Sequence, residues 1–316
     1  MSKKTKLSFG IIALLLLVIL GQKYINFSHV PSVKAWKGDA DEIVITNKGA
    51  SPVSIHKKDG AWVVGDKNFA ADINAVSGIE KKMKELSFSE LVTKKAFYER
   101  FDLTADSAIR VTVKSGGKVL RDILVGKGSG AGDLCYVKFT DKPEVYLAGG
   151  NLIAECNKNI DSLRDRSLIA LTIDTIDSVT VNAKGERYTL TREAVKTPEK
   201  KDDKSSAQAP GGKWVVTGRT GDVNQNKVTE YLNEFAGITA QSFPNEEDAK
   251  KRASSFAGEI TLKAKGKTIV FTVYGKNEED KGNTFLCRSS ENPYFANVAK
   301  WKIDRLLNGS GDLFKK

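Results

Sequence analysis

Histidine and cysteine are scarce in this 316-residue chain, which has two histidines and three cysteines. His29 and His56 have no Cys or His neighbour at the spacing of a metal site. Cys135, Cys156 and Cys287 form no CxxC pair, and their odd number leaves no complete disulfide framework. A serine or cysteine nucleophile needs a base within hydrogen-bond reach, which two histidines rarely provide. We therefore predict a non-enzymatic protein without a catalytic, cofactor or metal site; a hydrolase using a lysine or carboxylate base is the alternative.

Basic runs interleaved with aromatic residues are also missing. The chain has 50 Lys and Arg against 39 Asp and Glu, a net charge of +11, but acids alternate with lysines, as in residues 80–85. A single-strand nucleic-acid binder needs aromatic platforms beside its cations, so we expect no nucleic-acid partner. The positive surface leaves anionic lipid or an anionic envelope polymer as ligands to consider.

Long apolar runs are absent except at the N-terminus. The uncharged run from Leu7 to Gly21 follows Lys3, Lys4 and Lys6. Positive residues stay on the cytoplasmic side of a membrane, so the remaining chain should lie outside it. The run is about 15 residues long, short of the ~20 that span a bilayer comfortably. No small-x-small cleavage pattern follows directly, so we favour an uncleaved anchor over a cleaved signal peptide.

This segment predicts the organisation of the N-terminal region. Residues 1–21 are expected to form a cytoplasmic tail and one transmembrane helix, which acts as a signal anchor. Residues 22–39 are expected to form a juxtamembrane spacer.

One short motif occurs twice and indicates a duplicated domain. Gly60-Ala61-Trp62-Val63-Val64 returns about 150 residues later as Gly212-Lys213-Trp214-Val215-Val216. Each copy is followed by Asp-aliphatic-Asn, beginning at Asp72 and Asp222. Further along, each copy has a strand ending in Gly-Lys, a proline turn and a final Ile-Asp-x-Leu. The sequence therefore predicts two tandem repeat domains.

The domains predicted are residues 40–165 and 166–316, each a mainly antiparallel sheet with two helices, which is an α+β class. Apolar residues at helical spacing predict one helix after Asp72 and a closing helix at about residues 152–163. Residues 194–211 are rich in Lys, Asp, Ser, Pro and Gly and poor in apolar groups. We expect this stretch of the second domain to be a disordered surface loop.

Four residues are candidate structural positions. Trp62 and Trp214 are each followed by two valines in a strand, so we expect them to fill the two cores; exposed platforms that stack on sugars are the alternative. Asp72 and Asp222 are expected to open helices, where a carboxylate accepts hydrogen bonds from free backbone N–H groups.

Two further features have both a functional and a structural interpretation. The glycine-rich segment at residues 126–132 resembles a phosphate cradle, but a cradle requires a helix behind it, and a strand is expected here. Cys135 and Cys287 occupy similar places in the two copies and are expected to be small buried hydrophobes. In an oxidising compartment, a disulfide between them is the alternative.

Taken together, these motifs resemble the bacterial domain-of-unknown-function family 4340. The resemblance covers most of residues 40–310 and rests on the N-terminal anchor, the strand at 59–64, the helix start at Ala71-Asp72, Phe101-Asp102-Leu103 and the strand end at Gly126. Asp102 stands where the family usually has glycine. The family has no established activity and no agreed catalytic residues, so the resemblance implies none here.

Some members of that family are associated with ABC-type transport components, which implies an anchored extracytoplasmic accessory subunit. We accordingly predict a binding or assembly module on the bacterial cytoplasmic membrane, with a single pass and most of the chain outside. Its expected partner is an ABC-type permease or another envelope protein. The alternative is a binder of anionic envelope polymer or lipid through the basic surface.

Overall fold

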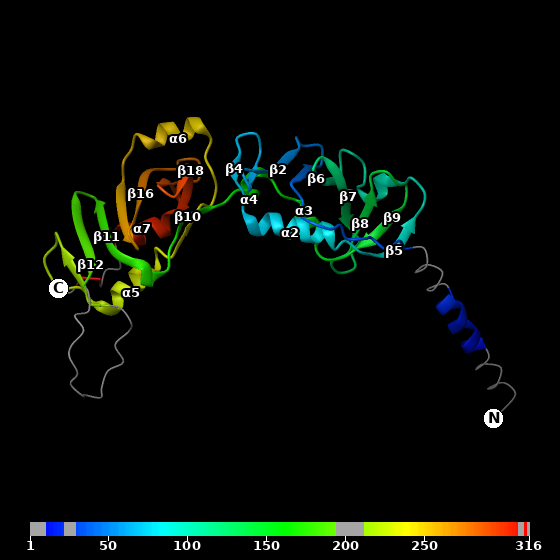
Figure 1. Ribbon diagram of the computed structural model, residues 1–316, viewed down its shortest axis with the longest axis horizontal. Helices are drawn as coiled ribbons and strands as arrows, with labels where there is room; N and C mark the ends of the chain where they lie inside the picture. The colour runs from blue at the N-terminus through cyan, green and yellow to red at the C-terminus, as the bar shows by residue number, and fades with distance from the viewer. Residues whose placement is uncertain (1–10, 22–29, 194–211, 309–312, 315–316) are drawn as a thin grey trace, which may run out of the picture. The chain divides into compact units, whose positions relative to one another are not determined.

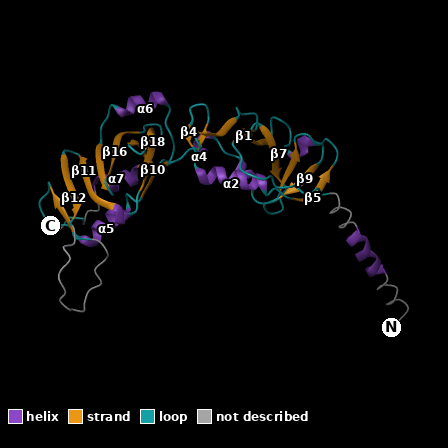
Figure 2. Cartoon of the chain, viewed as in Figure 1, coloured by secondary structure: helices purple, strands orange, loops and turns teal. Residues whose placement is uncertain are grey.

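The computed structural model describes residues 11–21, 30–193, 212–308 and 313–314. The chain divides into two compact units, Met1–Asp165 and Arg166–Lys316. Both units combine antiparallel sheets with helices (Figures 1 and 2), which confirms the predicted α+β class. We describe each unit by itself.

The first unit is built on a nine-stranded sheet in the order β4-β3-β2-β1-β6-β7-β8-β9-β5. Its strands are β1 (Glu42–Asn47), β2 (Val53–Lys58), β3 (Ala61–Val64), β4 (Phe69–Ala70), β5 (Phe88–Thr93), β6 (Ile109–Ser115), β7 (Lys118–Gly128), β8 (Cys135–Phe139) and β9 (Val145–Ala148). Alternate residues of β6 are buried because successive side chains point to opposite faces of a sheet. The apolar face of the sheet is therefore set by the period-two pattern of the sequence.

Helix α2 (Ile73–Lys84) covers this apolar face with α3 (Leu152–Cys156) beside it (Figure 1). Val76, Ile79 and Met83 of α2 are fully buried, because residues three or four apart share one side of a helix. Burying each of these side chains contributes roughly 2 kcal/mol. The unit also has the short helix α4 (Ile160–Leu163) and a 3₁₀ turn at Tyr98–Phe101.

The second unit has a seven-stranded sheet in the order β13-β12-β11-β15-β16-β17-β18 and a separate pair, β10-β14. Its strands are β10 (Ser167–Ala170), β11 (Ile176–Ala183), β12 (Glu186–Arg192), β13 (Trp214–Thr217), β14 (Gly237–Thr239), β15 (Gly258–Ala264), β16 (Lys267–Lys276), β17 (Thr284–Ser289) and β18 (Asn292–Ala299). Its helices are α5 (Gln225–Asn233), α6 (Glu246–Ala253) and α7 (Lys300–Asn308), with a 3₁₀ turn at Ile173–Thr175. Helices α5 and α7 contribute to the core, and α6 lies at the opposite end of the unit from α5 (Figure 1).

The two large sheets have seven strands in the same order along the chain. Across the first sheet this order is β3-β2-β1-β6-β7-β8-β9, and across the second it is β13-β12-β11-β15-β16-β17-β18. The first three strands therefore run in reverse chain order, and the last four run in chain order. The first strand of each large sheet, β1 or β11, thus pairs with a hairpin formed far along the chain, β6-β7 or β15-β16. The first unit adds β4 and β5 at the two edges of its sheet.

The prediction of two helices per copy is wrong, because each unit has three α-helices among the residues described after position 30. The predicted closing helix at 152–163 is split into α3 and α4. Asn159 caps α4 in a reciprocal arrangement with Ser162, so the chain restarts a new helix there. Helix α6 was missed because only Ala249 and Arg252 of it are buried, which leaves no apolar stripe to detect.

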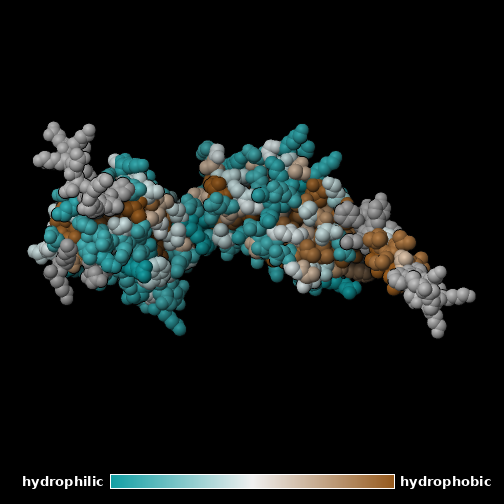
Figure 3. Space-filling view, turned by 90° about the horizontal axis from the view of Figure 1, so that it is seen from below, coloured by the Kyte–Doolittle hydropathy of each residue, from teal (hydrophilic) through white to brown (hydrophobic). Residues whose placement is uncertain are grey.

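At the N-terminus, residues 11–21 form a helix whose apolar side chains are exposed, Leu17 at 66% and Leu14 at 62%. They form a continuous hydrophobic surface (Figure 3). Within the described ranges, no helix combines the length and the apolarity needed to cross a membrane. Residues 1–10 and 22–29, which belong to the predicted anchor and spacer, and the predicted loop at 194–211 lie outside the described residues.

Candidate functional site

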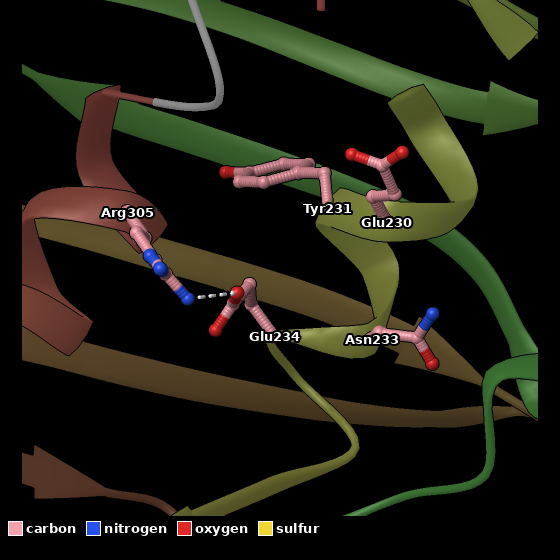
Figure 4. Close-up of a pocket in the computed structure, with 5 residues that line it drawn as sticks. All are labelled: Glu230, Tyr231, Asn233, Glu234 and Arg305. Carbon is pink, nitrogen blue, oxygen red and sulfur yellow. Dashed lines mark hydrogen bonds and ion pairs between the residues drawn. The ribbon is translucent and has the colours of Figure 1, made fainter. Parts of the chain in front are cut away.

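An open pocket of about 500 Å³ lies between α5 and α7 of the second unit. It is lined by Glu230, Tyr231, Asn233, Glu234 and Arg305 (Figure 4). The first four come from α5 and the residue that ends it, and Arg305 comes from α7 on the other side. The pocket thus combines carboxylates, an amide and a guanidinium around one aromatic ring.

Glu234 ties the two helices together by accepting from two cations. Its Oε2 accepts from Lys302 Nζ at 2.7 Å, and its Oε1 accepts from Arg305 Nη1 at 3.1 Å. Burial disfavours the charged carboxylate, but the hydrogen bonds and charges of Lys302 and Arg305 outweigh this effect and lower the pKa of Glu234. Glu234 is therefore an ionised structural acceptor rather than a proton donor near neutral pH.

Tyr231 forms the inner wall of the pocket. Its hydroxyl group donates to the carbonyl oxygen of Leu306 at 2.6 Å and lies 3.4 Å from the hydroxyl of Tyr188. Burial raises the pKa of Tyr231 well above its ordinary value. The phenol therefore stays neutral and fastens α5 to α7.

Trp301 is the most exposed tryptophan among the described residues, at 59%. It stands on α7 one turn before Arg305, whose guanidinium carbon lies 5.3 Å from its ring centroid. Lys302 Nζ lies 5.9 Å from the same centroid. Residues 301 and 305 share the outer face of the helix because Ile303 and Leu306 occupy the buried face. We call Trp301, Lys302, Arg305 and Glu234 the α7 surface.

The α7 surface was not predicted from the sequence, although the sequence contains one pattern that points to it. The spacing of Ile303 and Leu306 would have placed Trp301 outside the core. The pairing of Glu234 with Lys302 spans 68 residues and depends on how the helices pack. Trp301 and Arg305 are typical of residues that contribute strongly to binding at protein interfaces.

The residues predicted to be structural differ in how deeply they are buried and in whether they cap a helix. Trp214 is 6% exposed and belongs to the core of the second unit. Trp62 is half-buried and packs against the core of the first unit, with Lys57 Nζ 5.3 Å from its ring centroid. Asp72 is the N-cap of α2, and its Oδ1 accepts from Asn74 N at 2.9 Å.

The expectation that Asp222 opens a helix is wrong. Helix α5 begins at Gln225 and its N-cap is Asn224. Asp222 is exposed two residues earlier, where Val223 bridges to Phe314 and keeps the chain extended. The side chain of Gln225 bonds instead to the backbone of Trp214, so the second helix is positioned by a different contact.

The glycine-rich segment is a strand and a loop, as expected. Strand β7 continues to Gly128 and β8 begins at Cys135, so no helix follows that could hold a phosphate. A Cβ atom on Gly126 would lie 2.1 Å from the carbonyl oxygen of Phe101. Glycine is needed here for close backbone packing.

The three cysteines are free and buried. Burial raises the pKa of Cys135 to about 11 and that of Cys156 to about 12, and it raises the pKa of Cys287 well above its ordinary value. These groups are thiols at neutral pH, which is the state of a packing residue and not of a nucleophile.

The histidines and carboxylates of the described ranges do not form a metal site. His56 Nε2 lies 3.0 Å from Asn68 Oδ1 within the first unit, and His29 lies outside the described residues. No group of three or more His, Cys, Asp or Glu residues gathers at metal-binding distance within the part of the chain that the structure describes.

The architecture defines an α+β protein of two units, each with a large antiparallel sheet. A family model described as "Domain of unknown function (DUF4340)" matches residues 62–255, and the chain belongs to this family. The match begins in β3 and ends just after α6, so it includes Glu234 but not Trp301 or Arg305. No curated protein and no solved structure matches the chain.

Proposed function

We propose that the protein is a non-enzymatic binding or assembly module, tethered to the bacterial cytoplasmic membrane with most of the chain on the extracytoplasmic side. The observation that carries the proposal is the exposed ring of Trp301, which has two cations within 6 Å of it, one of them Arg305 at the edge of an open pocket. The partner that fits it is an envelope protein, in particular the permease of an ABC-type transport system.

The tether is supported by the N-terminal segment. The helix at residues 11–21 exposes apolar side chains that water solvates poorly, among them Leu17 and Leu20. Lys3, Lys4 and Lys6 precede it in the sequence, which favours an orientation with the N-terminus in the cytoplasm. A membrane would cover these side chains and leave both units on the other side.

The choice of a protein partner rests on the chemistry of the α7 surface. Tryptophan and arginine are enriched among the few residues that carry most of the binding energy at interfaces. Arg305 and Lys302 are held by Glu234, so binding would cost them little side-chain entropy. An accessory subunit needs such a prearranged patch and no reactive group.

We further propose that the two units are tandem copies of one fold. Their large sheets share the order of seven strands, and the Trp-Val-Val motif falls in equivalent strands, β3 and β13. A helix, α2 or α5, separates the third strand from the later ones in both units. An experimental structure in which the two large sheets fail to superpose would remove this part of the proposal.

Site-directed photo-cross-linking in intact cells tests the binding surface. A photoreactive amino acid at position 301 is expected to capture an envelope protein, identified by mass spectrometry as a permease or its associated component. The matched control is position 256, where Phe256 is 57% exposed on the same unit. In detergent-solubilised membranes, Trp301→Ala should weaken recovery of that partner about thirtyfold, and Phe256→Ala should not. Equal capture from both positions, or no envelope protein from position 301, contradicts the proposal.

The second candidate is a binder of anionic envelope polymer or lipid. It is favoured by the net charge of +11 and by exposed lysines of the first unit, such as Lys34, Lys37 and Lys142. Such binding should weaken as salt rises. If the protein does not bind anionic vesicles or wall polymer, or if its binding does not change with salt, this candidate is excluded.

A further inference from the structure

Arg121 fastens the residues that precede β1 to the sheet of the first unit. This side chain of β7 is only 9% exposed, and its Nη2 donates to the carbonyl oxygen of Lys34 at 2.9 Å. Its Nε donates to the carbonyl oxygen of Met83 at 3.2 Å, and its guanidinium carbon lies 5.6 Å from the Trp36 ring centroid. The chain that leads back to the N-terminal helix is thereby fixed at one corner of the unit.

Two further hydrogen bonds and packing against the core hold the same segment. Lys84 Nζ donates to the carbonyl oxygen of Gly38 at 3.0 Å and lies 5.9 Å from the Trp36 ring centroid. The backbone N–H of Ala40 donates to Glu80 Oε1 at 2.9 Å. Val33 and Trp36 pack against the core. Part of the predicted spacer, from residue 33 onward, is therefore a layer of the first unit.

Cations and aromatic rings gather where this segment lies. Lys34 and Lys37 are exposed on the segment itself. Phe139 lies 6.0 Å from the Arg121 guanidinium carbon, and Lys142 Nζ lies 5.0 Å from the Phe139 ring centroid. Glu85 follows Lys84 directly and Asp141 precedes Lys142 directly, whereas Lys34 and Lys37 have no acid next to them in the chain. Clusters of basic residues close to a membrane are typical of surfaces that bind anionic lipid headgroups.

The chain leaves a short tether between this corner and the N-terminal helix. Only residues 22–29 separate that helix from the described residue 30. At about 3.5 Å per residue, the connection reaches at most about 30 Å. A helix held in a membrane would keep the corner close to the headgroups and raise its effective concentration there. A soluble polymer or a distant protein has no comparable advantage.

We propose that this corner docks on anionic phospholipid headgroups and holds the first unit against the membrane surface. We call it the docking corner and define it by Lys34, Trp36, Lys37, Lys84, Phe139 and Lys142. The inference rests on the membrane tether of the proposed function and deepens its second candidate by selecting lipid as the ligand. Phosphate groups pair with the lysines, while Trp36 and Phe139, half-buried against the core, support the chain beneath them.

The test uses the full chain in nanodiscs of phosphatidylcholine alone and in discs with about one third phosphatidylglycerol. The acetylation rates of individual lysines are read by mass spectrometry. Lys34, Lys37 and Lys142 should be acetylated about fivefold more slowly in the anionic discs at low salt, and this protection should disappear near 1 M salt. The exposed lysines Lys213, Lys250 and Lys263 of the second unit serve as internal references.

A triple variant, Lys34→Glu/Lys37→Glu/Lys142→Glu, leaves Arg121 in place and should remove the dependence of Lys84 acetylation on lipid composition. The matched control, Lys213→Glu/Lys250→Glu/Lys263→Glu, should retain it. Equal acetylation of the docking corner in both kinds of disc, in a chain that stays with the discs, overturns the docking and leaves the tether intact. A chain that separates from both kinds of disc overturns the tether and the docking together.

Discussion

The hydroxyl group of Tyr231 donates a hydrogen bond to the backbone carbonyl oxygen of Leu306 at 2.6 Å, and both groups are buried. This bond joins α5 to α7 behind the pocket. Because the backbone oxygen has been removed from water, its partner cannot be deleted without a desolvation penalty. The contact therefore sets the spacing of the two helices that form the α7 surface.

We expect Tyr231→Phe to lower the free energy of unfolding by about 1–3 kcal/mol, because it leaves the Leu306 carbonyl oxygen unpaired in the core. Chemical denaturation with circular dichroism measures the loss. Tyr274→Phe is the matched control, because the Tyr274 side chain is half-buried. Equal stability of Tyr231→Phe and the control would show that the hydrogen bond does not stabilise the helix pair.

The pairing of Glu234 with Lys302 and Arg305 predicts a dependence on pH. The pKa of Glu234 is lower in the folded chain than the ordinary value of 4.5, so the ionised carboxylate stabilises the fold. This contribution is complete above the unfolded pKa and is lost as the pH falls through the folded pKa. The stability difference between wild type and Glu234→Gln should therefore be constant near neutral pH and shrink below about pH 4.5.

Urea denaturation at a series of pH values measures this difference, and a double-mutant cycle assigns its cause. In a Lys302→Met background, the effect of Glu234→Gln should be smaller than in the wild type. A difference that grows toward acid pH would mean that the ion pairs do not lower the pKa of Glu234.

Substitutions of three tryptophans compare the stability contributed by a buried, a half-buried and an exposed ring. Trp214→Ala should cost about 3–5 kcal/mol, because it empties a buried site. Trp62→Ala should cost less, about 1–3 kcal/mol, because the ring is half-buried. Trp301→Ala should change stability by less than about 0.5 kcal/mol. Melting curves of the three variants check this order, and a large loss in Trp301→Ala would assign that ring to folding instead of binding.

Gly126 tests the close approach of two backbone segments. Its missing side chain leaves room for the Phe101 carbonyl oxygen, so Gly126→Ala should cost about 1–3 kcal/mol through overpacking. Gly128→Ala is the control, because its nearest neighbour would be the Leu134 carbonyl oxygen at 3.9 Å. Equal melting temperatures for the two variants would contradict the close packing at Gly126.

Local patterns in the sequence predict some of these elements well. Helix α2 has a cap at Asp72 and buried residues at Val76, Ile79 and Met83, so both its start and its inner face can be read directly. Helix α6 has charged residues on most of its surface and a buried Arg252, which no apolar period reveals. The second cap was misplaced because Val223 pairs with Phe314, far along the chain.

The candidate site was harder to predict than the fold. Trp301 and Arg305 stand one turn apart, and the burial of Ile303 and Leu306 fixes their outward direction. Their meeting with Glu234 is a tertiary contact that sequence spacing does not encode. The docking corner depends in the same way on Arg121 reaching Lys34 and Met83, 87 and 38 residues away.

The most direct test of the account is the mature N-terminus and topology of the protein in its own membrane. After a carbonate wash, the chain is expected to stay with the membrane, keep the residues before Gly21, and lose both units to protease added outside spheroplasts. Intact-mass measurement and protease accessibility give these results together. Release by carbonate, protection of the units from external protease, or a mature chain that starts near residue 22 or 36 would contradict the tethered extracytoplasmic module.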